Sequence, residues 1–195
     1  MEHVHLVGIG GAGMSAIATV LLERGNVVSG SDSQVSNFTS SLASAGAEVF
    51  IGHRAPQIAG ADVVLISSAI PDSNPEIRAA WAAGIPVVRR NDFIGSLMEG
   101  SLGVAVAGTH GKTTTAALLA YVLYRSGLDP SFIVGGLIND LGINAKHGSG
   151  KPFVVEADEY DRMFLGLNPT VAVITNVEYD HPDCYVTAED MIDAF

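Results

Sequence analysis

Short runs of β-branched residues alternate along the whole chain with longer segments that have helical periodicity. Strands that alternate with helices in this way are typical of a parallel sheet covered by helices, so the pattern predicts an α/β fold. In the first half of the chain it predicts strands at residues 3–8, 27–30, 48–51, 62–67 and 86–89, and helices at residues 12–24, 74–83 and 92–98.

The same alternation starts again after a short polar connection at residues 99–103. The second half is predicted to contain strands at residues 104–107, 132–134, 153–156 and 171–175, a helix at 113–126 and a loop at 135–150. With 48% apolar residues the chain can bury a core, which argues against disorder. We therefore expect two domains, at residues 1–100 and 101–195.

The charge balance narrows the possible ligands. Ten basic and 21 acidic side chains give a formal net charge of −11, which argues against general binding of DNA or RNA. No apolar run approaches the roughly 20 residues that span a bilayer, so membrane insertion is not expected. The N-terminus lacks a secretory signal pattern. Cys184 is the single cysteine of the sequence, which fits a reducing, cytoplasmic location.

The last residues of the sequence predict the start of a helix. Thr187 and Asp190 have capping-box spacing, and Met191, Ile192 and Phe195 are expected to share one helical face. The chain stops after two turns without a glycine cap or a helix breaker. We interpret this as a fragment of a longer protein, with a short natural terminal helix as the alternative.

A first glycine-rich loop directly follows the first predicted strand and opens the first predicted helix. Gly8, Gly10 and Gly13 form G-x-G-x-x-G, a pattern that lets the backbone approach a diphosphate at a helix N-terminus. Asp32 follows at the end of the second strand, where a ribose-binding acid is expected. The loop does not identify its nucleotide: NAD and a nucleoside-diphosphate sugar are equally acceptable, and a tight turn that binds nothing is the plain alternative.

A second glycine-rich loop, AGTHGKTT, follows the strand predicted at residues 104–107. It departs from the strict P-loop pattern because Val106 stands where the first glycine is expected, and Gly108 supplies the nearest one. Gly111, Lys112 and Thr113 keep the part of the pattern that carries the chemistry. Successive N–H groups can still cradle an anion, the lysine can reach the outer phosphates of ATP, and the threonine hydroxyl can bind Mg²⁺.

Carboxylates follow the apolar strand predicted at residues 153–156. In P-loop folds this strand end usually holds the nucleotide-bound magnesium, and we assign that role to Glu156. Asp158 would share a face with Glu156 if the strand continued. Glu159 and Asp161 are expected to be solvated loop acids, since charged side chains are mostly exposed.

His181 follows the last predicted strand, next to Asp180. A neutral imidazole there can bind a divalent metal, although a lone histidine more often caps or packs. Among the remaining residues, His3 and His5 are expected to be structural, and Cys184 lacks the partners of a nucleophile. One of Arg89 and Arg90 can face the first nucleotide. Three aromatic residues at helical spacing are expected in the core: Trp81, Tyr121 and Tyr124.

Taken in order, these motifs resemble those of the Mur ligase family, the ATP-dependent enzymes that add amino acids in bacterial peptidoglycan synthesis. The resemblance covers essentially the whole chain. The segments that carry it are GIGGAGMS (8–15), SGSD (29–32), SSAI (67–70), NPE (74–76), GTHGKTTT (108–115), EADEYD (156–161) and TNVEYDHPD (175–183).

The resemblance implies a Rossmann-like parallel-sheet domain that binds a UDP-linked substrate, followed by part of a P-loop ATPase α/β domain. The family's C-terminal, amino-acid-binding domain would be absent. Within the family, the sequence is most similar to the branch that joins L-alanine to UDP-N-acetylmuramate. The implied reaction is amide formation through an acyl phosphate, with ATP and Mg²⁺ as cofactors and these two small molecules as substrates.

The resemblance also assigns individual residues. The UDP-substrate site would contain Gly8, Gly10, Gly11, Ala12, Gly13, Met14, Asp32, His53, Ser67 and Ser68. The ATP phosphates would lie on Gly108, Thr109, His110, Gly111, Lys112, Thr113 and Thr114. Catalytic roles fall to Lys112, Glu156 and His181, and metal binding falls to Thr113, Glu156 and His181.

Three alternatives stay open at this point. A related ligase attaches a recycled murein tripeptide to the same nucleotide and would share these two domains. An NAD-dependent oxidoreductase with an incidental second loop is a different class. A nucleotide-binding module without catalytic activity is the third. The sequence does not give the oligomeric state.

Overall fold

The computed structural model describes residues 2–195, and of Asn91 and Asp161 only the backbone. The chain forms two compact units, Met1–Phe93 and Ile94–Phe195, and passes from one to the other within helix α4 (Arg90–Leu97). Each unit contains a five-stranded sheet. None of the helices in the described part of the chain has the length and apolarity to cross a membrane.

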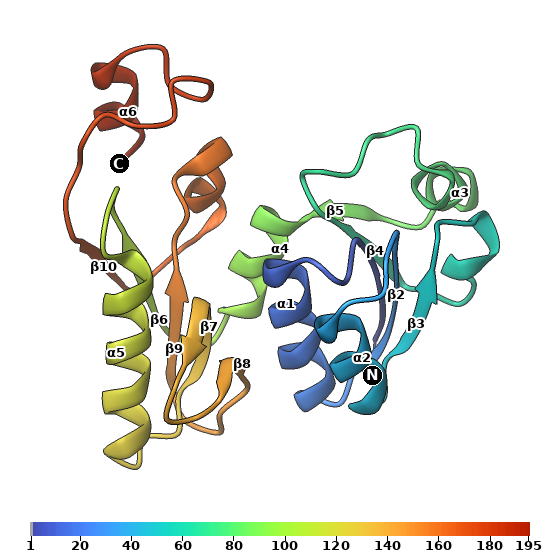
Figure 1. Cartoon of the computed structure of the whole chain (residues 1–195), viewed down its shortest axis with the longest axis horizontal. Coiled ribbons are helices and arrows are strands. Elements are labelled where there is room, and N and C mark those ends of the chain that lie inside the picture. Colours follow the sequence, from blue (N-terminus) through green and yellow to red (C-terminus); the bar gives the residue numbers. More distant parts are fainter. Residues whose placement is uncertain (1) are drawn as a thin grey trace. The chain divides into compact units, whose positions relative to one another are not determined.

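The first unit has the strand order β3-β2-β1-β4-β5, and every neighbouring pair in it is parallel (Figure 1). This order, with its switch point between β1 and β4, confirms the Rossmann-like expectation. The strands are β1 (His3–Val7), β2 (Val27–Asp32), β3 (Glu48–Ile51), β4 (Val63–Ile66) and β5 (Val87–Arg89).

Helices cover the two faces of this sheet. Figure 1 shows α1 (Ala12–Glu23) next to α2 (Asn37–Ser44), while α3 (Pro75–Ala83) lies apart from them and packs with the 3₁₀ turn η1 (Ala55–Ile58). The sequence analysis missed α2 because its residues, NFTSSLAS, are mostly polar and bury only Thr39 and Leu42.

The central strand β1 separates an apolar face from a partly polar one. Val4 and Leu6 are fully buried and alternate with His5 and Val7, which are also buried. Val7 belongs to the apolar cluster that packs under α3, so His5 points to the same side. A strand buried on both faces fits its position in the middle of a parallel sheet.

The second unit has the strand order β10-β6-β9-β7-β8. All pairs are parallel except β7–β8, so the sheet is mixed. The predicted loop at 135–150 is wrong in part, because β7 runs on to Ile138 and β8 follows it; two glycines in β7 and the brevity of β8 hid both. The strands are β6 (Leu102–Ala107), β7 (Ser131–Ile138), β8 (Ile143–Lys146), β9 (Pro152–Glu156) and β10 (Val171–Ile174).

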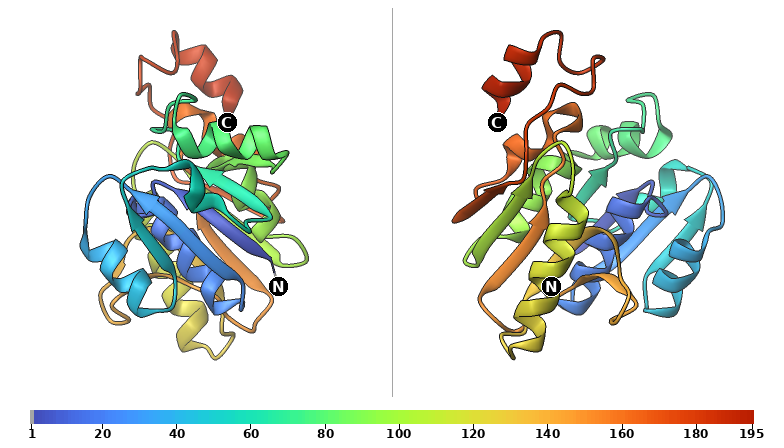
Figure 2. Two further views of the ribbon diagram at one scale, coloured as in Figure 1. Left: turned by 90° about the vertical axis from the view of Figure 1, so that its right-hand side faces the viewer. Right: turned by 60° about the vertical axis from the view of Figure 1, so that its left-hand side comes forward.

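Helix α5 (Lys112–Arg125) runs along one face of the second sheet (Figure 2). Ala116 and Ala120 are its fully buried residues, and they pack in one cluster with Val104, Val106 and Val154 of the sheet. Small residues on the helix therefore let it approach the valines closely. This cluster fixes the position of the loop that joins β6 to α5.

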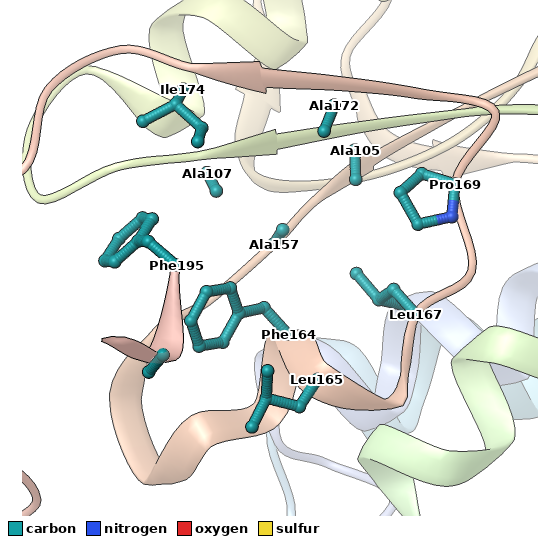
Figure 3. Close-up of a pocket in the computed structure, with 11 residues that line it drawn as sticks. Ala105, Ala107, Ala157, Phe164, Leu165, Leu167, Pro169, Ala172, Ile174 and Phe195 are labelled. Atoms are coloured by element: carbon teal, nitrogen blue, oxygen red, sulfur yellow. The ribbon is translucent and has the colours of Figure 1, made fainter. Parts of the chain in front are cut away.

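The opposite face of the same sheet borders a cavity of about 190 Å³. Ala105 and Ala172 line it from the strands, and Phe164 of the 3₁₀ turn η2 (Tyr160–Gly166) lines it from below (Figure 3). Phe195, after helix α6 (Ala188–Ala194), also points into it, with its ring 5.0 Å from that of Phe164. The lining is apolar, so this cavity has none of the character of a phosphate site.

The predicted capping box of the last helix is confirmed, since Thr187 and Asp190 exchange hydrogen bonds. Met191 is fully buried, whereas Ile192 is exposed and does not share its face. Two of the three aromatic residues expected in the core are also exposed, Trp81 by 53% and Tyr124 by 38%. Helical spacing places such residues on a face but does not say whether that face is covered.

Candidate functional site

The first glycine loop is held in place by the end of β2. The backbone N–H groups of Gly8 and Ile9 both donate to the carbonyl oxygen of Ser31, at 2.8 and 3.0 Å. The N–H of Gly10 donates to Oδ2 of Asp32 at 2.9 Å. These three N–H groups are thus occupied, and the N–H groups that remain for a ligand belong to the first turn of α1.

The N-terminus of α1 has the features of an anion site. Its N-cap residue is Gly11, and the N–H groups of Ala12, Gly13 and Met14 have no partner within the helix because of their position in the first turn. A Cβ at Gly13 would collide with Nη1 of Arg90, so a guanidinium lies directly beside this turn. The cation and the helix dipole therefore favour the same negatively charged ligand.

The other residues assigned to the UDP substrate have mixed surroundings. Asp32 uses Oδ2 on Gly10 and accepts weakly at Oδ1 from Gln34 N–H, at 3.3 Å, so a ribose would have to compete for its oxygens. Ser67 lies near Gly8, since its Cβ would be 3.5 Å from a Cβ added there. Ser68 is exposed. Their contacts with a ligand stay predictions.

His53 is part of a buried polar network that the sequence analysis did not foresee. Its Nδ1 lies 2.9 Å from Oε2 of Glu76 and 2.9 Å from Oγ of Ser31. The other oxygen of Glu76 lies 3.3 Å from Nε2 of His5, whose Nδ1 is 2.8 Å from Oγ of Ser29. His3 joins the same serine at 2.7 Å, so the expectation that both strand histidines are structural is confirmed.

Glu76 is fully buried in the first turn of α3. Burial raises the pKa of this carboxyl, but hydrogen bonds with His5, Ser31 and His53 outweigh that effect and leave the pKa below its ordinary value. The ionised carboxylate of Glu76 therefore links α3 to the strands β1 and β2. The signal in the sequence was the NPE segment, in which Asn74 caps the helix and leaves the glutamate in its first turn.

The second glycine loop depends on backbone conformations that favour glycine. Gly108 has a φ of +131° and Gly111, the N-cap of α5, has a φ of +80°. A Cβ at Gly108 would collide with Oγ1 of Thr175 and would lie 2.9 Å from the carbonyl oxygen of Asn176. The loop can thus pass close to the segment that follows β10.

This neighbouring segment holds the loop through several hydrogen bonds. The N–H groups of Thr109 and His110 donate to the backbone oxygen and to Oδ1 of Asn176, at 3.0 and 2.9 Å. The carbonyl of His110 accepts from Oγ1 of Thr175 at 2.6 Å and from Nδ2 of Asn176 at 3.0 Å. Asn176 therefore replaces part of the support that a longer P-loop would give itself, a role that its sequence position did not reveal.

Lys112 folds back over its own loop. Its Nζ donates to the carbonyl oxygens of Gly108 and Thr109, at 2.6 and 3.3 Å. It also lies 2.8 Å from Oε1 and 2.7 Å from Oε2 of Glu159. The expectation that Glu159 is a solvated acid is wrong, because its carboxylate is buried with the lysine as its counter-ion. The side chain of Asp161 lies outside the described residues.

Glu156 contacts the helix that follows the loop, as a magnesium-binding acid should. Thr113 Oγ1 donates to its Oε1 at 2.8 Å, and Gly135 N–H donates to its Oε2 at 2.6 Å. Asp158 does not share a strand face with Glu156, because β9 ends at Glu156. The Oδ1 of Asp158 accepts instead from the N–H of Tyr160.

His181 has a left-handed backbone, with a φ of +55°, at the tight turn after Asp180. Its Nε2 lies 3.4 Å from Oε1 of Glu159 and 3.8 Å from Oδ2 of Asp180, and its ring meets Tyr160 edge-on. We predicted that Glu156 and His181 share a metal. In the part of the chain that the structure describes, their side chains have no partner in common: Glu156 contacts Thr113 and Gly135, whereas His181 lies near Glu159 and Asp180. Their joint metal role stays a prediction.

The donors around Glu156 fit Mg²⁺. A carboxylate and a hydroxyl 2.8 Å apart are both oxygen ligands of the kind this ion takes. No cluster of three or more His, Cys, Asp or Glu side chains suited to a metal occurs among the described residues.

Comparison with known proteins assigns the family. Residues 3–101 match the catalytic domain of the Mur ligase family, and residues 106–195 match the Mur ligase middle domain. The chain belongs to the Mur ligase family. The two matches extend over both units and include both glycine loops.

Curated relatives of this Mur ligase chain share about half of its residues. It is 50% identical over 195 residues to the UDP-N-acetylmuramate–L-alanine ligase of Geobacter sp. (strain M21). This match covers all of this chain and 42% of that protein. It is 52% identical over 185 residues to the enzyme of the same name from Laribacter hongkongensis, covering 95% of this chain and 39% of that protein. The chain thus spans about two fifths of the length of these relatives.

Solved structures agree with the fold. The UDP-N-acetylmuramate–alanine ligase of Thermotoga maritima has a TM-score of 0.91 at 34% identity, over 100% of this chain and 46% of that one. The UDP-N-acetylmuramate:L-alanyl-gamma-D-glutamyl-meso-diaminopimelate ligase of Neisseria meningitides has a TM-score of 0.90 at 32% identity, over 100% of this chain and 66% of that one.

Proposed function

We propose that this chain is the nucleotide-binding part of a ligase that uses ATP to join L-alanine to the carboxylate of UDP-N-acetylmuramate. The observation that carries the proposal is the identity of about half of all residues, over the whole chain, with relatives of that name. The two glycine loops, each at a helix N-terminus, supply the anion sites that such a reaction needs.

The first unit would bind the UDP-linked substrate. The diphosphate would lie at the start of α1, against the N–H groups of Ala12, Gly13 and Met14 and beside the Arg90 guanidinium. Asp32, His53, Ser67 and Ser68 are the proposed contacts for the rest of the molecule. The network around Glu76 supports His53 from behind and fixes its ring.

The second unit would bind ATP. The first-turn N–H groups of α5 and the Lys112 ammonium would neutralise the triphosphate, which must accept a second anion, the lactyl carboxylate, at its γ-phosphate. That attack gives an acyl phosphate and ADP, and the amine of L-alanine then attacks the acyl carbon and releases phosphate. Lys112 would therefore neutralise negative charge on the triphosphate, both before and during phosphoryl transfer.

Glu156 and His181 would hold a second metal near the acyl group, and Thr113 would hold magnesium on the ATP side. Bound there, it would withdraw charge from the phosphate oxygens. Glu156 is kept ready by the N–H of Gly135, which fixes one of its oxygens. The charge of −11 and the nature of these sites favour small-molecule partners over nucleic acids, and the single cysteine fits a cytoplasmic location.

Ligand titration tests the proposal. We expect the 195-residue chain to bind UDP-N-acetylmuramate and a non-hydrolysable ATP analogue with Mg²⁺ in isothermal titration calorimetry, and not NADH. Binding of NADH without UDP-N-acetylmuramate would favour an oxidoreductase instead. We expect the isolated chain not to ligate, so alanine-dependent phosphate release by it would contradict the interpretation that it is a fragment.

A murein tripeptide ligase is the second candidate, because the structure of the Neisseria meningitides ligase matches this chain nearly as well as that of the alanine ligase. Both enzymes would use the same nucleotide sites. Turnover of the full-length protein with L-alanine and with the tripeptide separates them, and we expect L-alanine to be the better substrate.

A further inference from the structure

The carboxylate of Glu159 lies between two of the proposed catalytic residues, Lys112 and His181. Its Oε1 is 2.8 Å from Nζ of Lys112 and 3.4 Å from Nε2 of His181. Its side chain is 1% exposed, so both contacts are made in an environment that water screens poorly. A single carboxylate therefore connects the glycine loop to the segment that follows β10.

The backbone of Glu159 is fixed independently of its carboxylate. Its carbonyl oxygen accepts the Tyr185 hydroxyl at 2.6 Å, and Tyr185 is fully buried. The same oxygen accepts the N–H of Arg162 at 3.0 Å. Because the main chain is anchored in this way, the carboxylate is presented at a defined place and does not follow the movements of its partners.

Lys112 has no hydrogen left for a phosphate in this arrangement. An ammonium has three hydrogens, and its acceptors here are the carbonyl oxygens of Gly108 and Thr109 and the carboxylate of Glu159. A triphosphate that binds at the loop must therefore take the ammonium from Glu159. Once it has done so, the carboxylate is left with His181 as its nearby partner.

We propose that Glu159 is a positioning residue, which holds the Lys112 ammonium over the loop before the triphosphate binds and holds the His181 imidazole during the reaction. This inference rests on the proposed function, because it assigns a role toward the ATP phosphates. It predicts opposite effects on two steps. The acid competes with the triphosphate for Lys112, so it weakens ATP binding, and it places His181, so it speeds turnover.

The Glu159→Gln variant of the full-length ligase tests this division. Without the competing charge, we expect the dissociation constant of the ATP analogue to fall about 3- to 10-fold. Without its anchor for His181, we expect kcat to fall about 10- to 100-fold. Glu189→Gln removes an exposed acid of the same unit and should change neither quantity. A side chain with only a structural role would weaken ATP binding and turnover together, and that result would overturn the proposal.

The reactivity of the lysines gives a readout without turnover. In the nucleotide-free 195-residue chain, we expect an acylating reagent to modify Lys112 several-fold faster in Glu159→Gln than in the wild type, because the ammonium has lost its buried counter-ion. Lys146 and the exposed Lys151 serve as internal controls in the same mass spectra. An unchanged rate at Lys112 would contradict the contact on which the proposal depends.

A measurement on the wild-type chain covers the case in which the variant does not fold. The NMR signals of the Lys112 ammonium nitrogen and of the Glu159 carboxyl carbon should both shift when the ATP analogue and Mg²⁺ are added. If the analogue binds and neither signal moves, Glu159 does not hold Lys112 for the triphosphate. If the analogue does not bind at all, the proposed function fails, while the contact in the free chain is still tested by acylation.

Discussion

At the scale of single residues, Lys112 is the residue that gives the second glycine loop a positively charged side chain. Its ammonium already bridges two loop carbonyls and a buried acid, so its stem is ordered before any ligand arrives. An ordered cation loses little conformational freedom when it meets a phosphate. For the proposed neutralisation of the phosphates, this ordered ammonium has to exchange Glu159 for the triphosphate.

Lys112→Ala in the full-length ligase should abolish this contribution. We expect kcat to fall about 100-fold or more, because a preorganised charge at the transferred phosphate is lost. Binding of UDP-N-acetylmuramate, measured by calorimetry, should be unchanged. Lys151→Ala removes an exposed lysine and serves as the control. Near-normal turnover of Lys112→Ala would show that the assigned role is wrong.

Asp129 is an acid whose role is structural. Its Oδ1 lies 2.6 Å from Nζ of Lys146, and its Oδ2 accepts from the N–H and the hydroxyl of Ser149, at 2.8 and 2.9 Å. The hydrogen bond with Lys146, followed by those with Ser149, holds the pKa of Asp129 well below its ordinary value. The folded state therefore favours the ionised form.

The stabilisation from Asp129 should depend on pH. Because the pKa is lower in the folded than in the unfolded chain, the contribution is present above about pH 4 and is lost as the pH falls toward the folded value. At pH 7, Asp129→Asn should lower the free energy of unfolding by about 1 kcal/mol, since the group is partly exposed. Urea titrations at several pH values check this, with Asp140→Asn as an exposed control. A difference that stays constant down to pH 3 would contradict it.

The sequence reveals the chemistry of a residue more readily than its partners. The glycines, Lys112 and Glu156 lie in local patterns, and each takes the place in its loop or strand end that its pattern predicts. Glu159 and Asn176 could not be placed in this way, because their roles arise from contacts between segments far apart in the chain. Charged side chains are mostly exposed, so a sequence gives little reason to expect a buried acid; here Lys112 supplies the counter-ion of the buried Glu159.

At the scale of elements, the predictions succeeded where burial creates a strong pattern. The strands β1, β2 and β4 and the helices α1, α3 and α5 all carry buried apolar residues. The missed elements, α2 and β8, are short and lie at the margin of their units, where most of their residues stay exposed or half-buried. A segment that buries few apolar side chains does not need a regular spacing of apolar residues, so its sequence gives only a weak periodic signal.

The second glycine loop offers a matched pair of substitutions at this scale. Gly108→Ala meets both an unfavourable φ and a collision with Thr175, whereas Gly111→Ala meets an unfavourable φ with open space around it. We expect a loss of about 1 kcal/mol in the free energy of unfolding for Gly111→Ala, from backbone strain, and of about 3 kcal/mol or more for Gly108→Ala. Denaturant titrations measure both. Equal losses would mean that the segment after β10 yields to the added methyl group.

At the scale of the whole molecule, the chain repeats one physical arrangement on two different sheets. In each unit, a buried parallel strand ends in a glycine loop, and the next helix begins with backbone N–H groups that have no partner within it. In each unit, a neighbouring segment takes up the first N–H groups of the loop, through Ser31 and Asp32 in one case and Asn176 in the other. The ligand-binding groups are thus separated from the supporting ones within the same loop.

This separation predicts two independent footprints in hydrogen exchange. UDP-N-acetylmuramate should slow exchange at residues 12–14, and the ATP analogue with Mg²⁺ should slow it at 111–114, while N–H groups already bonded to Ser31 and Asn176 should change little. At a ligand concentration of about 100 times the dissociation constant, each ligand should stabilise its unit by about 2.7 kcal/mol. Exchange measured by mass spectrometry on the 195-residue chain, with each ligand alone, checks both footprints. If one ligand protects both loops, or if the protected groups are the ones already bonded, then the division of each loop into supporting and binding N–H groups does not hold.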